Sequence, residues 1–135
     1  MAATDKIRSV LTPSGNGPLI DPDCEQEIYD IVMKSGKIVK FAKDYKARLD
    51  ILLKHRERAW QVHNKWFETL KYVNDSSLYS MHMASIDNMR IIYTVGNRII
   101  FLCAFKEKES SDRGRGSYTQ YIPVAKKRLE KYKEV

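Results

Sequence analysis

The sequence predicts an α+β fold, in which a small antiparallel sheet packs against N-terminal helices and one more helix follows the sheet. Two observations support this class. Residues 37–73 contain no proline or glycine, and their apolar side chains recur at steps of three and four, as in an amphipathic helix. Residues 78–105 contain short runs rich in β-branched and aromatic side chains, which are typical of strands. Helices and strands that occupy separate parts of a chain indicate an α+β domain.

The composition predicts a basic protein, and the lack of a Walker loop, a dinucleotide fingerprint or zinc-ligand spacing predicts no cofactor. The chain has 135 residues, of which 43% are hydrophobic, and its net charge of +7 favours RNA, DNA, anionic lipid or an acidic protein as partner. A basic surface without any ligand is the alternative. No apolar run reaches the roughly 18 residues of a membrane span, and residues 1–10 lack the apolar core of a signal peptide. Cys24 and Cys103 lack metal-ligand spacing, which predicts reduced cysteines in a cytoplasmic protein without a bound metal.

Residues 1–20 are predicted to be a flexible segment that precedes a single domain over residues 21–135. This segment is rich in proline, glycine, serine and asparagine, which favour turns. A helix should begin at Asp21, a good capping residue, with Pro22 in its first turn and Gly36 at its end. Residues 28–33 could instead form a strand, but the agreement of the end signals favours the helix.

The long segment at residues 37–73 predicts either two packed helices that break near residues 55–58 or one long helix. One apolar stripe runs along the segment, and Trp60 and Trp66 lie on it. We therefore expect both tryptophans in the core rather than in a binding platform.

Three strands and a final helix complete the predicted fold. The strands are expected at Leu78–Met83, Asn88–Val95 and Arg98–Phe105. Gly96 and Asn97 suit a tight hairpin turn between the second and third strands. Alternation within the second strand places Arg90 on the face opposite to that of its neighbours Met89 and Ile91. After a charged loop, a helix is expected over residues 117–133, with Pro123 in its first turn.

Roughly the last 40% of the chain carries four short motifs in order, LYSMH, MRI, AFK and AKKRL. In this set of motifs the chain resembles the RelE/HigB-type toxins of toxin–antitoxin systems, which belong to the RelE/ParE superfamily. The resemblance implies a RelE-like domain and an endoribonuclease that cuts mRNA, often on the ribosome. It also implies a small antitoxin protein as partner, and no cofactor. The first 36 residues have no counterpart in this resemblance.

The resemblance further implies which residues cut RNA. In this reaction the ribose 2′-hydroxyl attacks the adjacent phosphate, so the protein must hold the phosphate and move protons. Arg90 matches the arginine of the family's second strand, and its planar guanidinium suits phosphate. His82 and Tyr121 match positions that could transfer protons, and Lys106 opens a basic cluster after the third strand. These four residues form the predicted catalytic set.

Further residues are predicted to bind RNA, namely Ser80, Lys108, Arg113, Arg115 and Tyr118. Tyr118 is an alternative to Tyr121 as a ring that stacks on a base, and the two arginines lie in a short glycine–arginine tip that suits an RNA backbone. Ser80 stands where many relatives have a basic residue, and Glu107 and Glu109 dilute the lysine cluster. Each side chain also has an ordinary structural role as its alternative, such as a solvated charge or a ring that packs the last helix.

Two other functions stay open at this point. ParE-like toxins share the fold but poison DNA gyrase, and they would not need the set of Arg90, Lys106 and Tyr121. A regulatory protein could use the basic surface to bind nucleic acid without cutting it.

Overall fold

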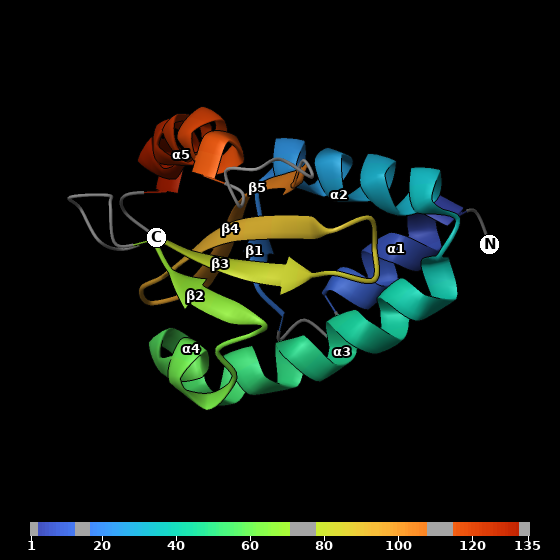
Figure 1. Cartoon of the computed structure of the whole chain (residues 1–135), viewed down its shortest axis with the longest axis horizontal. Coiled ribbons are helices and arrows are strands. Elements are labelled where there is room, and N and C mark those ends of the chain that lie inside the picture. Colours follow the sequence, from blue (N-terminus) through green and yellow to red (C-terminus); the bar gives the residue numbers. More distant parts are fainter. Residues whose placement is uncertain (1–2, 13–16, 71–77, 108–114, 133–135) are drawn as a thin grey trace.

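The computed structural model describes residues 3–12, 17–70, 78–107 and 115–132, and it confirms the α+β class (Figure 1). The helices are α1 (Ala3–Leu11), α2 (Pro22–Ser35), α3 (Ile38–His55), α4 (Ala59–Val62) and α5 (Arg115–Leu129), with short 3-10 turns at Arg56–Arg58 and Glu130–Tyr132. The strands are β1 (Leu19–Ile20), β2 (Phe67–Thr69), β3 (Leu78–Met83), β4 (Met89–Val95) and β5 (Ile99–Lys106).

The strands form one sheet in the order β1-β5-β4-β3-β2. The three predicted strands are present as β3, β4 and β5, and they pair in antiparallel fashion as expected. Two strands were not predicted. β2 pairs antiparallel with β3, and β1 pairs parallel with β5, so the sheet as a whole is mixed.

The sheet separates two hydrophobic clusters, and in Figure 1 it lies between α5 and α3. Side chains of α1, α2 and α3 share one cluster with Met81, Ile91 and Tyr93 of the sheet. Residues of α5, among them Ile122, share the second cluster with Ile92 and neighbouring residues of β5. Because strand side chains alternate between faces, Ser80, His82 and Arg90 belong to the α5 side.

The N-terminal segment differs from its prediction, because Ala3–Leu11 is a helix instead of a flexible segment. Ile7 and Leu11 are buried in the first cluster, and the Tyr45 hydroxyl donates to the Leu11 carbonyl oxygen at 2.7 Å. The apolar side chains of α1 thus find a tertiary partner, which outweighs the local turn signals. Residues 13–16, which carry part of those signals, lie outside the described residues.

The helix predicted after Asp21 is confirmed as α2, and the alternative strand at residues 28–33 is wrong. The Asp21 carboxylate accepts from the Asp23 backbone N–H at 3.0 Å, and Pro22 occupies the first turn. Gly36 ends the helix with a φ of 69°, a left-handed conformation that glycine adopts without strain.

The segment after residue 37 breaks where the first alternative placed the break, but its second half is not one helix. α3 ends at His55, a 3-10 turn follows, and α4 spans a single turn. Phe67–Thr69 forms β2 at the edge of the sheet, although its apolar spacing fits a helix. The expected helix is therefore wrong at this point, because backbone pairing with β3 decides the local structure.

The last helix is present, but Pro123 lies inside α5 and not in its first turn. The far end of this helix is tied to the start of α2. Arg128 donates to both carboxylate oxygens of Glu27 at 2.8 and 2.9 Å, and the Tyr132 hydroxyl donates to Asp21 at 2.9 Å. These contacts fix α5 across the sheet and set the position of its first turns. Within the described part of the chain, no helix has the length and apolar character needed to cross a membrane.

Candidate functional site

Polar side chains gather on the α5 side of the sheet, close to the ends of β2, β3 and β4. His82 and Arg90 are direct cross-strand neighbours, and Glu68 pairs with Ser80 on the same face. Tyr118 reaches them from α5 and is buried. The structure therefore brings together His82, Arg90, Ser80 and Tyr118 of the predicted set, and it adds Glu68.

Carboxylates surround the guanidinium of Arg90. Its Nε donates to Glu107 Oε2 at 2.6 Å, and its Nη1 donates to Glu68 Oε1 at 3.0 Å and to the Tyr118 hydroxyl oxygen at 2.9 Å. The exposed fractions of the side chains are 15% for Arg90, 8% for Glu107 and 44% for Glu68. Glu107 is thus a fixed partner of the arginine, whereas Glu68 stands at the solvent side and can leave.

The Tyr118 hydroxyl links these groups. It donates to the Glu68 carboxylate and hydrogen-bonds to Ser80 Oγ at 2.8 Å. Burial raises the pKa of Tyr118 well above its ordinary value, so the hydroxyl keeps its proton at neutral pH. A hydroxyl in this state can donate a hydrogen bond or a proton, and it cannot serve as a resting base.

His82 is oriented by Asn88. The imidazole Nε2 contacts Asn88 Oδ1, and Asn88 Nδ2 donates to Glu107 Oε2 at 3.2 Å. Since the amide nitrogen of Asn88 is used toward a carboxylate, its oxygen must accept, and we assign the proton of neutral His82 to Nε2. Burial lowers the pKa of His82, which favours the neutral ring. Nδ1 then carries a lone pair and can accept a proton.

Four of these side chains open into one hollow of about 140 Å³, namely Glu68, Ser80, His82 and Arg90. Its lining consists of Asn64, Lys65, Trp66, Phe67, Glu68, Ser80, His82 and Arg90. The hollow therefore combines two cations (Lys65 and Arg90), the His82 imidazole and the Glu68 carboxylate within a small space. Trp66 offers no free ring face for a base, because His63 stacks on it at 3.9 Å and the Arg48 guanidinium lies 4.1 Å from its centroid.

Several predicted site residues lie elsewhere. Lys106 pairs with Met89 and so belongs to the opposite face of the sheet from Arg90, with its ammonium 3.9 Å from Asp87. Tyr121 stacks on Phe105 with ring centroids 4.4 Å apart and does not line the hollow. The structure thus does not bring Lys106 and Tyr121 together with Arg90.

The described part of the chain does not test whether the predicted basic tip lies near the hollow. Lys108 and Arg113 lie outside the described residues. Arg115 begins α5, and its side chain is not described.

Sequence reasoning missed Glu68, Asn88 and the role of Glu107. Glu68 was expected on a helix, and only the pairing of β2 with β3 turns it toward Arg90. A signal did exist for Asn88, because an asparagine directly before a strand favours the left-handed turn conformation that it adopts here, with a φ of 57°. Glu107 follows the strand that ends beside Arg90, so it was a candidate partner for that arginine.

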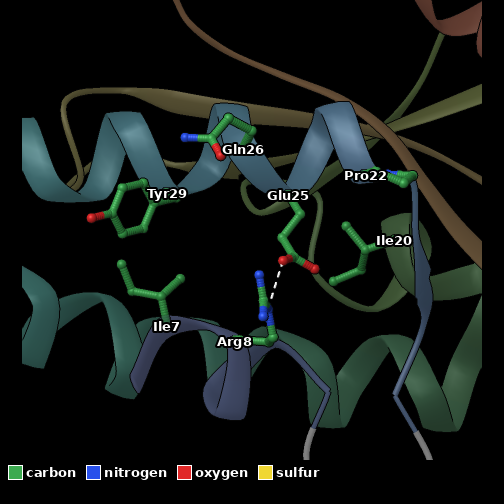
Figure 2. A pocket seen from close by; sticks show the side chains of 7 residues that line it. All are labelled: Ile7, Arg8, Ile20, Pro22, Glu25, Gln26 and Tyr29. Carbon is green, nitrogen blue, oxygen red and sulfur yellow. Dashed lines mark hydrogen bonds and ion pairs between the residues drawn. The ribbon is translucent and has the colours of Figure 1, made fainter. Parts of the chain in front are cut away.

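A second hollow of about 380 Å³ lies between α1 and α2 (Figure 2). Ile7, Ile20 and Tyr29 contribute apolar surface, and the Arg8 guanidinium donates to Glu25 at 2.8 Å across the opening. Among the described residues, the lining of this hollow contains one cation, Arg8, but no imidazole that could accept a proton. We place the candidate site at Arg90 for this reason.

Among the described residues, no group of histidine, cysteine, aspartate and glutamate side chains could hold a metal ion. No family model, no curated protein and no solved structure matches this chain.

Proposed function

We propose that the protein is an endoribonuclease that cuts mRNA by attack of the 2′-hydroxyl on the adjacent phosphate, and that it acts as the toxin of a toxin–antitoxin pair. The observation that carries this proposal is the hollow in which Arg90, His82 and Glu68 meet. Cleavage of RNA needs a cation for the phosphate and groups that move protons, and this hollow supplies both. The proposed partners are mRNA, free or on the ribosome, and an antitoxin protein, and the proposed location is the cytoplasm.

In this proposal Arg90 binds the scissile phosphate. Glu107 holds Nε and keeps the guanidinium in place, while Glu68 occupies the outer Nη1 until the phosphate displaces it. The exposed Glu68 carboxylate and the substrate phosphate thus compete for the same donor. An arginine suits the task because its fork can hold one anion while it presents further N–H groups to another.

His82 accepts the proton of the 2′-hydroxyl at Nδ1. The bond between O2′ and phosphorus forms while the bond between phosphorus and O5′ breaks. The Tyr118 hydroxyl, released from Glu68, gives its proton to O5′ and regains one from water, and the imidazolium returns its proton to water. The products are a 2′,3′-cyclic phosphate and a 5′-hydroxyl end.

The test incubates the purified protein with single-stranded RNA and identifies the chemical ends of the products. A cyclic phosphate should form, and RNA with a 2′-deoxy sugar at the cleaved position should resist. His82→Gln should lower the cleavage rate by about 10²-fold or more, the usual scale for loss of an acid–base group. Tyr121→Phe, whose ring stacks outside the hollow, is the matched control and should keep the wild-type rate.

Arg90 requires a milder variant than alanine. Arg90→Ala would leave the nearly buried Glu107 carboxylate without its cation, and breaking such a pair typically costs about 3–5 kcal/mol. Arg90→Lys keeps the charge and removes the fork, so it should remain folded and still lose most cleavage. Wild-type cleavage rates in both Arg90→Lys and His82→Gln would refute the proposed site.

One observation favours a second candidate, a protein that binds nucleic acid without cutting it. Both Glu68 and Glu107 bind Arg90, so the guanidinium is already neutralised in the free protein. If the wild type binds RNA and cuts none, with or without ribosomes, this candidate replaces the endoribonuclease. A protein that instead inhibits DNA gyrase would fit the ParE-like alternative.

A further inference from the structure

The turn between β3 and β4 separates the hollow at Arg90 from a larger cleft of about 710 Å³, which is distinct from the hollow between α1 and α2. We propose that this cleft binds the phosphate backbone of single-stranded RNA that flanks the cut, and this inference rests on the proposed function. The lining residues are Lys37, Ala84, Ser85, Asp87, Asn88, Lys106 and Glu107. Lysine ammonium groups on an open surface suit the backbone because they attract phosphate without reading a base.

Two lysines supply the charge of the cleft. Lys37 stands at the start of α3, and its Nζ donates to the Ser85 carbonyl oxygen at 3.1 Å. Lys106 ends β5, and both side chains are exposed. Among the described residues, Lys37 pairs with no carboxylate, so its hydrogen bond to the Ser85 carbonyl leaves the positive charge uncompensated.

Two carboxylates also face the cleft. Glu107 is engaged by Arg90 and Asn88, so it adds little free negative charge. Asp87 lies 3.9 Å from the ammonium of Lys106 and opposes an anion there. The balance of free charge is therefore two cations against one anion, and Asp87 is the group whose removal should strengthen binding.

The two sites share a wall, which is the reason to assign them to one ligand. Asn88 lines the cleft and contacts His82, and Glu107 lines the cleft and contacts Arg90. The β3–β4 turn and the start of α3 lie at the same end of the sheet in Figure 1. A strand that leaves the hollow can thus cross this end of the sheet and reach Lys37.

The basic surface continues beyond the cleft. Lys40 and Lys43 follow Lys37 on the exposed side of α3. Lys40 is 3.3 Å from Asp44, but three lysines against this one aspartate leave the row basic. A single strand of RNA matches this row because it carries one phosphate per nucleotide along a flexible backbone.

The test measures the affinity for an uncleavable 2′-O-methyl RNA of about ten nucleotides, a length within the range of single-strand binding sites. Titrations at several salt concentrations give the slope of log K against log salt. Each phosphate contact contributes about 0.7 to this slope for single strands, so Lys37→Gln with Lys106→Gln should reduce it by about 1.4. The control is Lys54→Gln with Lys127→Gln, two exposed lysines outside both sites, and it should keep the wild-type slope.

Asp87→Asn gives a test of opposite sign. Asparagine tolerates the left-handed backbone of this position, where φ is 49°, so the fold should persist. The loss of one opposing charge should tighten binding of the same RNA several-fold at low salt. The same titration is repeated with an acidic peptide of the same charge. If the peptide binds as tightly as the RNA, with the same dependence on Lys37 and Lys106, the assignment to RNA is overturned.

The outcomes separate this inference from the proposed function. If RNA is cut but the slope is unchanged in the lysine variant, the cleft is wrong and the endoribonuclease stands. If the slope falls as expected but no RNA is cut, the backbone cleft stands and catalysis is refuted. If the wild type does not bind the uncleavable RNA at all, both are refuted.

Discussion

Glu68→Gln should increase the affinity of the protein for RNA, although it alters a residue inside the candidate active site. Glu68 Oε1 accepts from Arg90 Nη1 at 3.0 Å, in the place that the scissile phosphate must take. Glutamine keeps the shape of the side chain and an oxygen that can accept from Arg90. The substitution removes only the negative charge that competes with the phosphate.

The magnitude follows from Coulomb's law and the exposure of the group. Two unit charges about 4 Å apart interact with about 4 kcal/mol near a protein surface and about 1 kcal/mol in water. The side chain of Glu68 is 44% exposed, so screening by solvent places the effect toward the lower figure. A gain of about 1.4 kcal/mol corresponds to tenfold tighter binding.

The assay is the dissociation constant for uncleavable 2′-O-methyl RNA at low salt, with Glu130→Gln as a control that removes the same charge from an exposed site beyond α5. The control should change affinity only slightly, because its charge is distant and screened. The reasoning is refuted if Glu68→Gln binds RNA no more tightly than Glu130→Gln.

Three further predictions concern pH and stability. Burial lowers the pKa of His82 below its ordinary value of 6.5, so the cleavage rate should be constant above pH 6.5 and fall at lower pH, where the imidazole becomes protonated. The pH–rate profile of the wild type should show this fall, and that of His82→Gln should lack it. The buried Tyr93 hydroxyl has no hydrogen-bond partner among the residues that the structure describes, so Tyr93→Phe should raise the free energy of unfolding in urea by about 1 kcal/mol, and a loss would contradict this. Asp21→Asn keeps the helix cap but loses its charge-assisted bonds to Lys131 and Tyr132, at about 1.5–3 kcal/mol. Burial opposes ionisation of Asp21, but these bonds lower its pKa on balance, so the difference in stability should vanish as the pH falls below 3.8.

Local signals in the sequence were sufficient where the structure depends on local contacts. The cap at Asp21, the proline after it and the glycine at residue 36 all act within a few residues of the helix ends, and α2 has the predicted bounds. The alternation in β4 likewise predicted the face of Arg90 correctly. Such features need no knowledge of what lies across the fold.

The missed elements depend on partners distant in sequence. β2 has apolar spacing that fits a helix, but the Trp66 carbonyl accepts from His82 N–H at 2.7 Å and joins the segment to the sheet. Glu68 became a site residue only through that pairing. Lys106 was placed in the catalytic set because the resemblance implies a basic cluster after the third strand. Phe105, however, is the partner of Arg90, so the next residue must point away. The register of two strands was therefore the missing information.

The charge distribution links the two proposed sites. The chain as a whole carries +7, but Glu68 and Glu107 both bind the Arg90 guanidinium, so an isolated phosphate gains little from this arginine. A strand bound at Lys37 and Lys106 brings its scissile phosphate to Arg90 at a high local concentration, and this can offset the displacement of Glu68. Cleavage should therefore depend on substrate length more steeply than a simple cationic site would allow. Glu68→Gln should reduce that dependence, measured as the ratio of kcat/KM for a ten-nucleotide RNA to that for a dinucleotide, because the phosphate then meets no competing charge. An unchanged ratio would show that the backbone cleft and the displacement of Glu68 are not coupled.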